Sequence, residues 1–411
     1  MRIFPLPLTP PSAEFSHLIL LSTLNTHRPG SRAKAVGVFK ALAIAVVVLL
    51  VLRGSPVESS EIRIATLGGE SRFLLDDTNL AAFPARAVDF PHASFEIFDE
   101  WAGLVIPVGK TRFAGLFFNR PTPEVIALNR YAESNGSRLF RQLEVVPWVD
   151  LMYASSLGDR LKIGLAGRVS YDVIEVDSRR ASARQSDLRA GLLIGAAGGL
   201  QIDAAIGIQR QDLRDTDASG GALGETDGTG LNGDVRLLLP LGERFQLIQF
   251  VGIESGSYAL APSRRDHLAI ELGIGLNFRP APDILLIGGV VVAGQNLDQT
   301  DPGVPVFQED ILTLPAVHVA AEAQQGSMIF RLGMNHSTEL LDRQEAPPGT
   351  PSRSLESHFD IQLGLGLEFG AVLLDGHLER DFLRDGPDFV GGSRHGGGIL
   401  SKVTVTHRMG Y

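Results

Sequence analysis

The acidic stretch "DTDASGGALGETDGTG" at 215–230 begins with the spacing of a calcium-binding loop. Asp215 and Asp217 are two residues apart and Gly220 is sixth, as in a twelve-residue calcium loop. Such a loop ends on a bidentate glutamate at its twelfth position, which is Thr226 here. We therefore predict a solvated external loop and no metal site.

Nucleophiles and bases also lack the arrangement that catalysis needs. In "GIESG" at 252–256 the serine, Ser255, is fourth, whereas a nucleophile elbow has its serine third. No pair of histidines or carboxylates has a fixed spacing that suggests a metal. The sequence has no cysteine, which excludes disulfides and thiol catalysis. We predict that the chain is not an enzyme and needs no cofactor.

The charge of the chain argues against a nucleic-acid partner. The net charge is −10, with 37 basic and 47 acidic residues in 411. Six of the basic residues but only two of the acidic ones precede residue 60, so the rest of the chain is more acidic still. Binding to phosphates needs clustered lysine and arginine, which this balance does not supply.

A single uninterrupted apolar run, "ALAIAVVVLLVL" at 41–52, follows Arg32, Lys34 and Lys40. Twelve residues of helix reach about 18 Å, which is short of the roughly 30 Å hydrocarbon core of a membrane. The run therefore predicts a cleaved signal peptide at 37–59, with an uncleaved anchor as the alternative. Residues 1–36 show no pattern typical of a targeting sequence. We interpret them as an extension that precedes the true start of translation.

Strict alternation of apolar and polar side chains dominates the rest of the chain. In "RLKIGLAGRVSYDV" at 160–173 it holds for about 14 residues, whereas a soluble strand has about 5–6. A period of two indicates a β-strand with one apolar face, although Pro147, Pro240 and Pro315 weaken their strands. Further strands are predicted at 187–196, 200–211, 231–241, 267–279, 328–335, 358–369 and 371–382, and less cleanly at 244–257, 283–295 and 311–323.

The connections between these predicted strands alternate between short turns and long loops. Short ones begin at 156, 196, 241, 279 and 324, and long polar ones span 176–184, 214–229, 258–266, 296–310, 339–354 and 385–397. Short turns at one rim and long loops at the other are the layout of an outer-membrane β-barrel. We predict an all-β fold, a transmembrane antiparallel barrel over 93–411. It should have about 14–16 strands, the best count being 16 with the first at 93–99.

The lipid-facing side follows from the cost of placing a charge in a membrane. An arginine or lysine that faces lipid at the midplane costs about 2–4 kcal/mol. The aliphatic faces should therefore point outward to outer-membrane lipid, and the charged faces into a polar lumen. The lumen-facing candidates are Lys162, Arg168, Asp172, Arg189, Asp203, Asp234, Arg236, Glu271, Arg331, Asp360, Glu368, Asp375 and Lys402.

Residues 60–92 precede the barrel and fit no strand. Asp76 or Asp77 can cap a short helix that ends before Pro84. The stretch "DDTNLAAFPA", with Asp76, Asp77, Pro84 and Ala85, resembles the segment before the first strand in outer-membrane long-chain fatty-acid transporters, although Phe83 replaces their asparagine. The resemblance implies a plug folded inside the barrel. A periplasmic linker or an irregular first hairpin is the alternative.

The last residues, "SKVTVTHRMGY", alternate up to Tyr411. Met409 and Tyr411 resemble the C-terminal signal of bacterial outer-membrane proteins, which ends in an aromatic residue. The resemblance implies recognition by the barrel-assembly machinery and location in the bacterial outer membrane. Closure of the last strand on the first would remove an edge that lipid cannot solvate.

Transport is the function that a polar-lined barrel most directly suggests, as a porin-like channel or transporter for small or hydrophobic solutes. An apolar pocket lined by Phe73, Leu74, Leu75, Leu80 and Phe83 would favour apolar solutes, but these side chains can equally pack a plug in place. The alternative is a structural or secretion-accessory barrel without transport. A helical candidate at 122–134 can either constrict the pore or cover the barrel outside.

Overall fold

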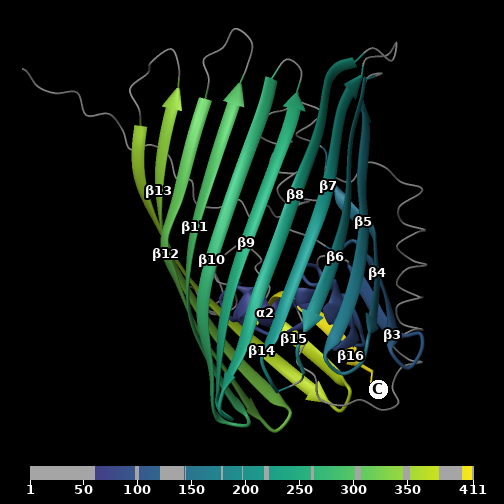
Figure 1. Ribbon diagram of the computed structural model, residues 1–411, viewed down its shortest axis with the longest axis vertical. Coiled ribbons are helices and arrows are strands. Elements are labelled where there is room, and N and C mark those ends of the chain that lie inside the picture. The colour runs from purple at the N-terminus through teal and green to yellow at the C-terminus, as the bar shows by residue number, and fades with distance from the viewer. Residues whose placement is uncertain are drawn as a thin grey trace, which may run out of the picture. The chain divides into compact units, whose positions relative to one another are not determined.

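The strands of the described chain pair antiparallel with their neighbours in sequence and close into a barrel (Figure 1). This computed structural model describes residues 61–97, 101–120, 143, 145–176, 179–196, 198–216, 222–260, 263–300, 307–345, 352–378 and 400–409. Within them lie sixteen strands: β1 (His92–Glu96), β2 (Ala102–Pro107), β3 (Arg112–Phe118), β4 (Val146–Ser156), β5 (Leu161–Val176), β6 (Arg179–Ile194), β7 (Gln201–Thr216), β8 (Ala222–Leu241), β9 (Phe245–Leu260), β10 (Ser263–Ala281), β11 (Ile284–Thr300), β12 (Phe307–Gln325), β13 (Met328–Glu345), β14 (Ser352–Phe369), β15 (Val372–Leu378) and β16 (Leu400–Arg408).

The barrel closes where β16 pairs with β1, from His92 opposite Arg408 to Glu96 opposite Thr404. The Thr404 hydroxyl donates to the Glu96 carboxylate at 2.6 Å, so a buried side-chain contact reinforces this seam. The predicted closed antiparallel barrel, with 16 as the best strand count, is confirmed. Tyr411, the signal-peptide region 37–59 and the helical candidate 122–134 lie outside the described residues.

The strands reach farther than the sequence pattern predicted. The expected long loop at 176–184 is wrong, because β5 continues to Val176 and β6 begins at Arg179. The acidic stretch 215–230 is likewise mostly strand, since β7 ends at Thr216 and β8 begins at Ala222. Most residues at these strand ends are polar on both faces, although β5 ends on Ile174, Glu175 and Val176, so no regular apolar alternation marks them. Pro147 and Pro315 are accommodated at register shifts of β4 and β12.

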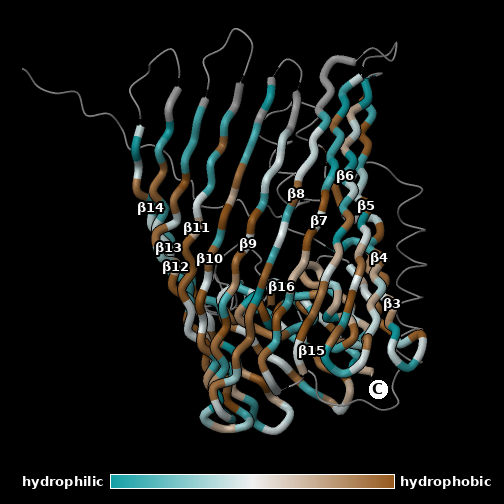
Figure 2. Tube along the Cα trace, in the orientation of Figure 1, coloured by the Kyte–Doolittle hydropathy of each residue, from teal (hydrophilic) through white to brown (hydrophobic). Residues whose placement is uncertain are grey.

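The outer face of the barrel is apolar over a limited height. Outward positions such as Leu165, Ile206, Ile270 and Val319 are exposed, and Figure 2 shows apolar segments below hydrophilic strand ends. The strands β5 to β14 have 16–20 residues, whereas spanning a membrane takes about 9–11. Their polar ends therefore extend beyond the apolar band. We call this the long-loop end and the opposite one, with turns such as 242–244, the short-turn end.

Residues 61–91, called the inner segment below, lie inside the barrel near the short-turn end (Figure 1). It contains the helix α2 (Glu61–Thr66) and the 3-10 helices η1 (Ser71–Phe73), η2 (Asp77–Leu80) and η3 (Pro84–Val88). The segment packs against strands from both halves of the barrel, with α2 near β13 to β16 and η3 near β4 to β6. Among the described residues, no helix is long and apolar enough to cross a membrane.

Candidate functional site: the inner segment and the lumen wall

Local caps divide the inner segment into short pieces. Gly68 and Gly69 have φ values of 93° and 83°, a conformation that favours glycine, and they follow the end of α2. The Glu70 carboxylate accepts from the Arg72 backbone N–H at 3.0 Å and caps η1. Asp76 caps η2 in the same way through Thr78 at 3.1 Å. The segment can therefore follow the curved wall instead of forming one straight helix.

Apolar side chains of the inner segment pack into the lower wall of the lumen. Phe73 is 1% exposed and contacts the rings of Phe250 and His318, with centroid distances of 5.4 and 5.8 Å. It joins a buried apolar cluster with inward side chains of β8 to β12, including Leu238 and Ile287. The lumen is therefore not uniformly polar as predicted, because the wall that faces the inner segment is aliphatic and aromatic.

Glycines in the wall make room for this packing. A Cβ at Gly275 or Gly289 would lie 2.4 Å from the Phe73 ring, and one at Gly164 would lie 2.3 Å from the Ala85 nitrogen. A Cβ at Gly333 would lie 2.3 Å from the Gly68 nitrogen. The wall is thus shaped to the backbone of the inner segment, which a loosely filling linker would not require.

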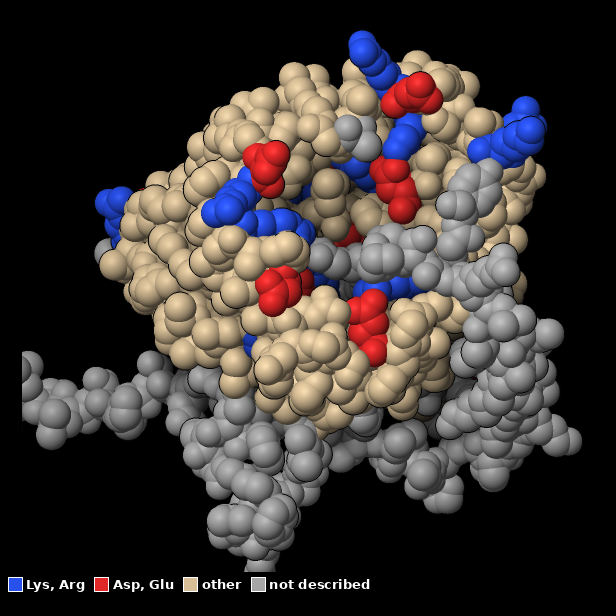
Figure 3. Space-filling view, turned by 90° about the horizontal axis from the view of Figure 1, so that it is seen from below, with Lys and Arg blue, Asp and Glu red and all other residues tan. Residues whose placement is uncertain are grey.

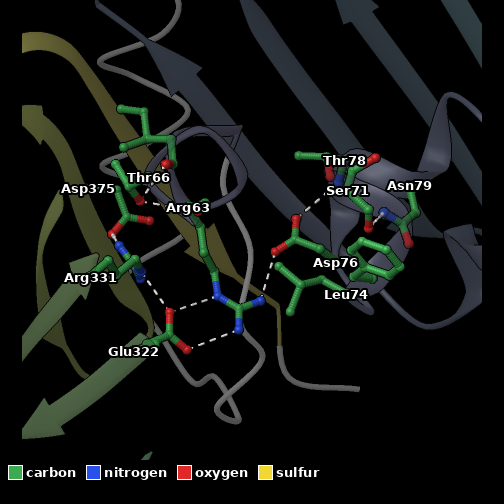
Figure 4. A network of polar contacts seen from close by, with 12 residues as sticks. Arg63, Thr66, Ser71, Leu74, Asp76, Thr78, Asn79, Glu322, Arg331 and Asp375 are labelled. Atoms are coloured by element: carbon green, nitrogen blue, oxygen red, sulfur yellow. Dashed lines mark hydrogen bonds and ion pairs between the residues drawn. The ribbon is translucent and has the colours of Figure 1, made fainter. Parts of the chain in front are cut away.

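A first ionic network joins α2 to β12, β13 and β15 (Figure 4). The Arg63 guanidinium donates to both carboxylate oxygens of Glu322, at 2.8 and 2.9 Å, and to Asp76 at 3.0 Å. Arg331 donates to Glu322 at 2.6 Å and to Asp375 at 2.5 Å. Arg63, Asp76 and Asp375 are fully or nearly fully buried. Two arginines and three carboxylates therefore hold the start of the segment to the wall.

A second ionic network joins η3, near the C-terminal end of the inner segment, to β7 and β8. Asp203 of β7 accepts from Arg86 of η3 at 2.8 Å and from Arg236 of β8 at 2.7 Å. Arg236, 0% exposed, also donates to the Leu74 carbonyl at 2.8 Å and to the Asn79 side chain. Its guanidinium lies 4.7 Å from the centre of the Phe83 ring. One wall arginine thereby satisfies a carbonyl, an amide and an aromatic ring of the inner segment.

A third network surrounds η1. Arg72 contacts Glu70 at 2.8 Å, Glu271 of β10 at 2.5 Å and Asp234 of β8 at 4.0 Å. Burial acts to raise the pKa of Glu70, but the hydrogen bonds and charge of Arg72 outweigh it and hold the pKa below its ordinary value. The same carboxylates raise the pKa of Arg72 against the opposing effect of burial. Glu70 is therefore ionised at neutral pH.

Asp76 and Asp77 form an acidic pair at the start of η2. Burial raises the pKa of Asp76 well above its usual range, and the neighbouring Asp77 raises it further against the opposing attraction of Arg63. An Asp77 carboxylate oxygen lies 3.2 Å from His92 Nε2. Pro84, at the first position of η3, packs against Gly164 and Gly191. All four predicted plug residues, Asp76, Asp77, Phe83 and Pro84, are thus buried inside the barrel.

The predicted lumen-facing residues divide by whether they touch the inner segment. Asp203, Arg236, Glu271 and Asp234 do so through the contacts above, and Lys162 pairs with Asp89. Figure 3, which looks at the short-turn end, shows acidic and basic side chains next to one another on this face. Many of the charged side chains of the lumen are therefore paired with one another or with charged groups of the inner segment.

Several other candidates contact side chains or backbone of the wall. Arg189 pairs with Asp234, Arg168 lies 3.5 Å from Asp150, and Glu368 accepts from Arg408 at 2.7 Å. Asp172 accepts from the Val173 backbone N–H at 2.8 Å, and Asp360 accepts from Gln362. Lys402 is half-buried opposite His377 of β15. Met409 follows β16, and its backbone N–H donates to the Pro91 carbonyl at 3.1 Å.

The basic side chains of the inner segment, Arg63, Arg72 and Arg86, were missed by the sequence reasoning, and so was their wall partner Glu322. The sequence does contain a pattern that could have predicted this packing. In some predicted strands, glycines stand at inward positions where polar residues are expected. Gly275 in "IELGIGLNF" and Gly364 in "IQLGLGLEF" interrupt the polar face where the side chains of Phe73 and Thr66 of the inner segment lie against the wall. Such runs indicate that the lumen is occupied at that height.

Comparison with known proteins gives likeness in fold only. No family model matches the chain, and no curated protein matches it. Solved structures with a similar arrangement are the siderophore receptor PiuA of Acinetobacter baumannii (8% identity, TM-score 0.42), the alcaligin outer-membrane receptor FauA of Bordetella pertussis (9%, 0.38) and the toluene transporter TodX of Pseudomonas putida (14%, 0.39).

The fraction of each chain that the structural match covers differs widely among these proteins. The match covers 56% of this chain and 47% of PiuA, 77% and 74% for FauA, and 86% and 97% for TodX. This chain thus spans about half the length of the siderophore receptor. All three TM-scores lie below 0.5, so these likenesses identify neither a relative nor a solute.

Proposed function

We propose that this chain is an outer-membrane barrel that conducts small solutes, and that the inner segment closes its short-turn end. The observation that carries the proposal is the fit of residues 61–91 inside a closed barrel. Backbone packs against wall glycines, and three ionic networks join the segment to β7, β8, β10 and β12. The apolar outer band of a closed barrel, with polar strand ends that extend beyond it, supports a location in the outer membrane.

Polar solutes fit the lumen better than apolar ones. Of the candidate lining of an apolar pocket, Phe73, Leu74, Leu80 and Phe83 are buried against the wall or the segment itself, and Leu75 is partly buried. Above them the inward side chains of β6 to β10 include Gln185, Gln209, Asn232 and Glu254. Hydrogen-bonding groups of this kind favour water-soluble cargo.

A structural barrel without transport is the second candidate. It is favoured by the mutual pairing of buried charges, since Arg63, Arg86, Arg236 and Arg331 all have carboxylate partners. Buried pairs of this kind resist displacement, because removing one partner leaves an uncompensated charge. The two candidates differ in whether the inner segment moves.

A disulfide between the segment and the wall distinguishes them. A Cβ at position 364 would lie 2.7 Å from Thr66 Cβ, and a disulfide needs about 3.5–4.5 Å, so a small shift allows the bond. The sequence has no cysteine, so the variant Thr66→Cys/Gly364→Cys carries the only thiols. We expect ionic current across a planar bilayer to be blocked after oxidation and restored by dithiothreitol.

The single variants Thr66→Cys and Gly364→Cys are the controls, because neither can form the cross-link. Equal current from the oxidised and reduced double variant would contradict a moving inner segment. Absence of current from the unmodified chain, the single variants and the reduced double variant would favour the structural barrel.

A further inference from the structure

The outer face of the barrel carries a groove over β6 to β11. Its volume is about 890 Å³, and it has Leu188, Ile208, Leu231 and Leu268 along one side. These four side chains point away from the lumen and are 41–56% exposed. They lie in one row of the sheet, in the order Leu188, Ile208, Leu231, Ser255 and Leu268, so the serine of β9 is the one polar side chain among them. The groove therefore faces the surroundings of the barrel and not the transport path.

The apolar row lies at the edge of the apolar band. On β10 the outward residues run from Phe278 near the short turn to Leu268, and the next outward residue is Asp266. Ten residues at about 3.3 Å, in a strand tilted by about 40°, rise roughly 25 Å, the height of the apolar band of such barrels. Figure 2 shows hydrophilic strand ends beyond this level. The groove thus lies where hydrocarbon gives way to headgroups.

Hydroxyl and guanidinium groups line the other side of the groove. Ser186, Thr229 and Ser257 are the next outward residues beyond the apolar row on β6, β8 and β9, and Arg210 and Arg264 lie on β7 and β10. Asp266 is the outward carboxylate in the lining, and the other ionisable lining residues, Asp187 and His267, belong to the inward face.

Both arginines are available to a ligand. Arg210 is 66% exposed and pairs with Asp227 at 3.2 Å, and Arg264 is 65% exposed and pairs with Asp266 at 2.9 Å. Exposed ion pairs contribute only about 0–1 kcal/mol, so a phosphate can replace the carboxylate at little cost. Guanidinium is the side chain that binds phosphate with two parallel hydrogen bonds.

We propose that this groove is a binding site for a phosphorylated lipid of the outer leaflet. The acyl chains lie along Leu188, Ile208, Leu231 and Leu268. The phosphate lies between Arg210 and Arg264, with the hydroxyl groups of Thr229 and Ser257, which are opposite each other on adjacent strands, as further donors. The long-loop end faces the cell exterior in barrels of this layout, which assigns the lipid to the outer leaflet. The site does not depend on the lumen or on transport, but it rests on the proposed location in the outer membrane.

The test uses the full chain in neutral detergent and dioctanoyl phosphatidic acid as the probe. Native mass spectrometry should show a one-to-one complex, and dioctanoylglycerol and inorganic phosphate should bind at least about tenfold more weakly. The variant Arg210→Gln/Arg264→Gln should weaken binding of the phosphatidic acid by about tenfold or more, which corresponds to about 1.4 kcal/mol. Each variant must keep its heat-dependent gel migration, which shows that the barrel is folded.

The matched control is Arg214→Gln/Arg353→Gln, which removes two exposed arginines outside the groove lining. This control should bind the phosphatidic acid as the unmodified chain does. Equal loss in both double variants would overturn the proposal, because it would show attraction to net charge without a site. Equal binding of dioctanoylglycerol and the phosphatidic acid would also overturn it, since the phosphate would then contribute nothing.

Discussion

At the scale of single residues, Asp203 of β7 joins the inner segment to the wall through two arginines. It is 1% exposed and is the carboxylate that Arg86 and Arg236 share. Asp203→Asn should lower the free energy of unfolding by about 3–5 kcal/mol, because two buried guanidinium groups lose their shared counter-charge. Urea unfolding in detergent micelles measures this change.

Asp212→Asn is the matched control for that change. Asp212 lies on the same strand and pairs with Arg214 at 2.9 Å, but the arginine is 54% exposed. An exposed pair contributes about 0–1 kcal/mol, so the control should lose no more than that. Equal losses in the two variants would show that burial of the Asp203 network does not matter.

The Glu70 contact predicts a dependence on pH. Arg72 holds the pKa of Glu70 below its ordinary value of 4.5, so the contact stabilises the docked segment above that pH. The stabilisation is lost as the pH falls through the lowered pKa of the folded state. Hydrogen exchange at residues 70–75, corrected for intrinsic rates, should be faster at acidic pH than at pH 7. Glu70→Gln should exchange faster at pH 7 and should lose most of the pH dependence.

At the scale of elements, the fit between α2 and β13 depends on Gly333. A Cβ there would meet backbone atoms of Leu67 and Gly68 at 2.3–2.6 Å, and backbone cannot move aside as a flexible side chain can. Gly333→Ala should displace the end of α2, which limited proteolysis near Leu67 and increased bilayer conductance would report. Gly288→Ala on β11 is the control, since a Cβ there meets no atom within 4 Å. Unchanged proteolysis of Gly333→Ala would contradict the close fit.

Elements also differ in how much of them the sequence revealed. The parts of β5, β7, β10 and β14 with one strictly apolar face were predicted, because such a face gives a period of two in the sequence. The polar extensions of β5 and β6 beyond the apolar band were missed, because water accepts polar side chains on both faces. The pieces η1 and η3 were also missed, since three to five residues are too few for a helical period to be visible.

At the scale of the whole molecule, the barrel and its contents are joined by contacts between distant parts of the sequence. Arg63 and Glu322 are 259 residues apart, and Asn277 of β10 donates to the Phe73 carbonyl from 204 residues away. The seam between β1 and β16 joins Glu96 to Thr404 across 308 residues. Displacement of the inner segment would therefore release contacts on most of the barrel at once, which suits a closure that is either docked or open.

The sequence by itself determined the closed barrel, the best count of its strands and the outward direction of its aliphatic faces. It could do so because a membrane imposes a period of two that can be read within one strand. Only the tertiary structure decided which lumen residues meet. Phe250 and Arg236 both point inward, yet one packs on Phe73 and the other binds the Leu74 carbonyl. Inside the barrel no solvent imposes a common pattern, so each inward residue is specified by the part of the inner segment that lies against it.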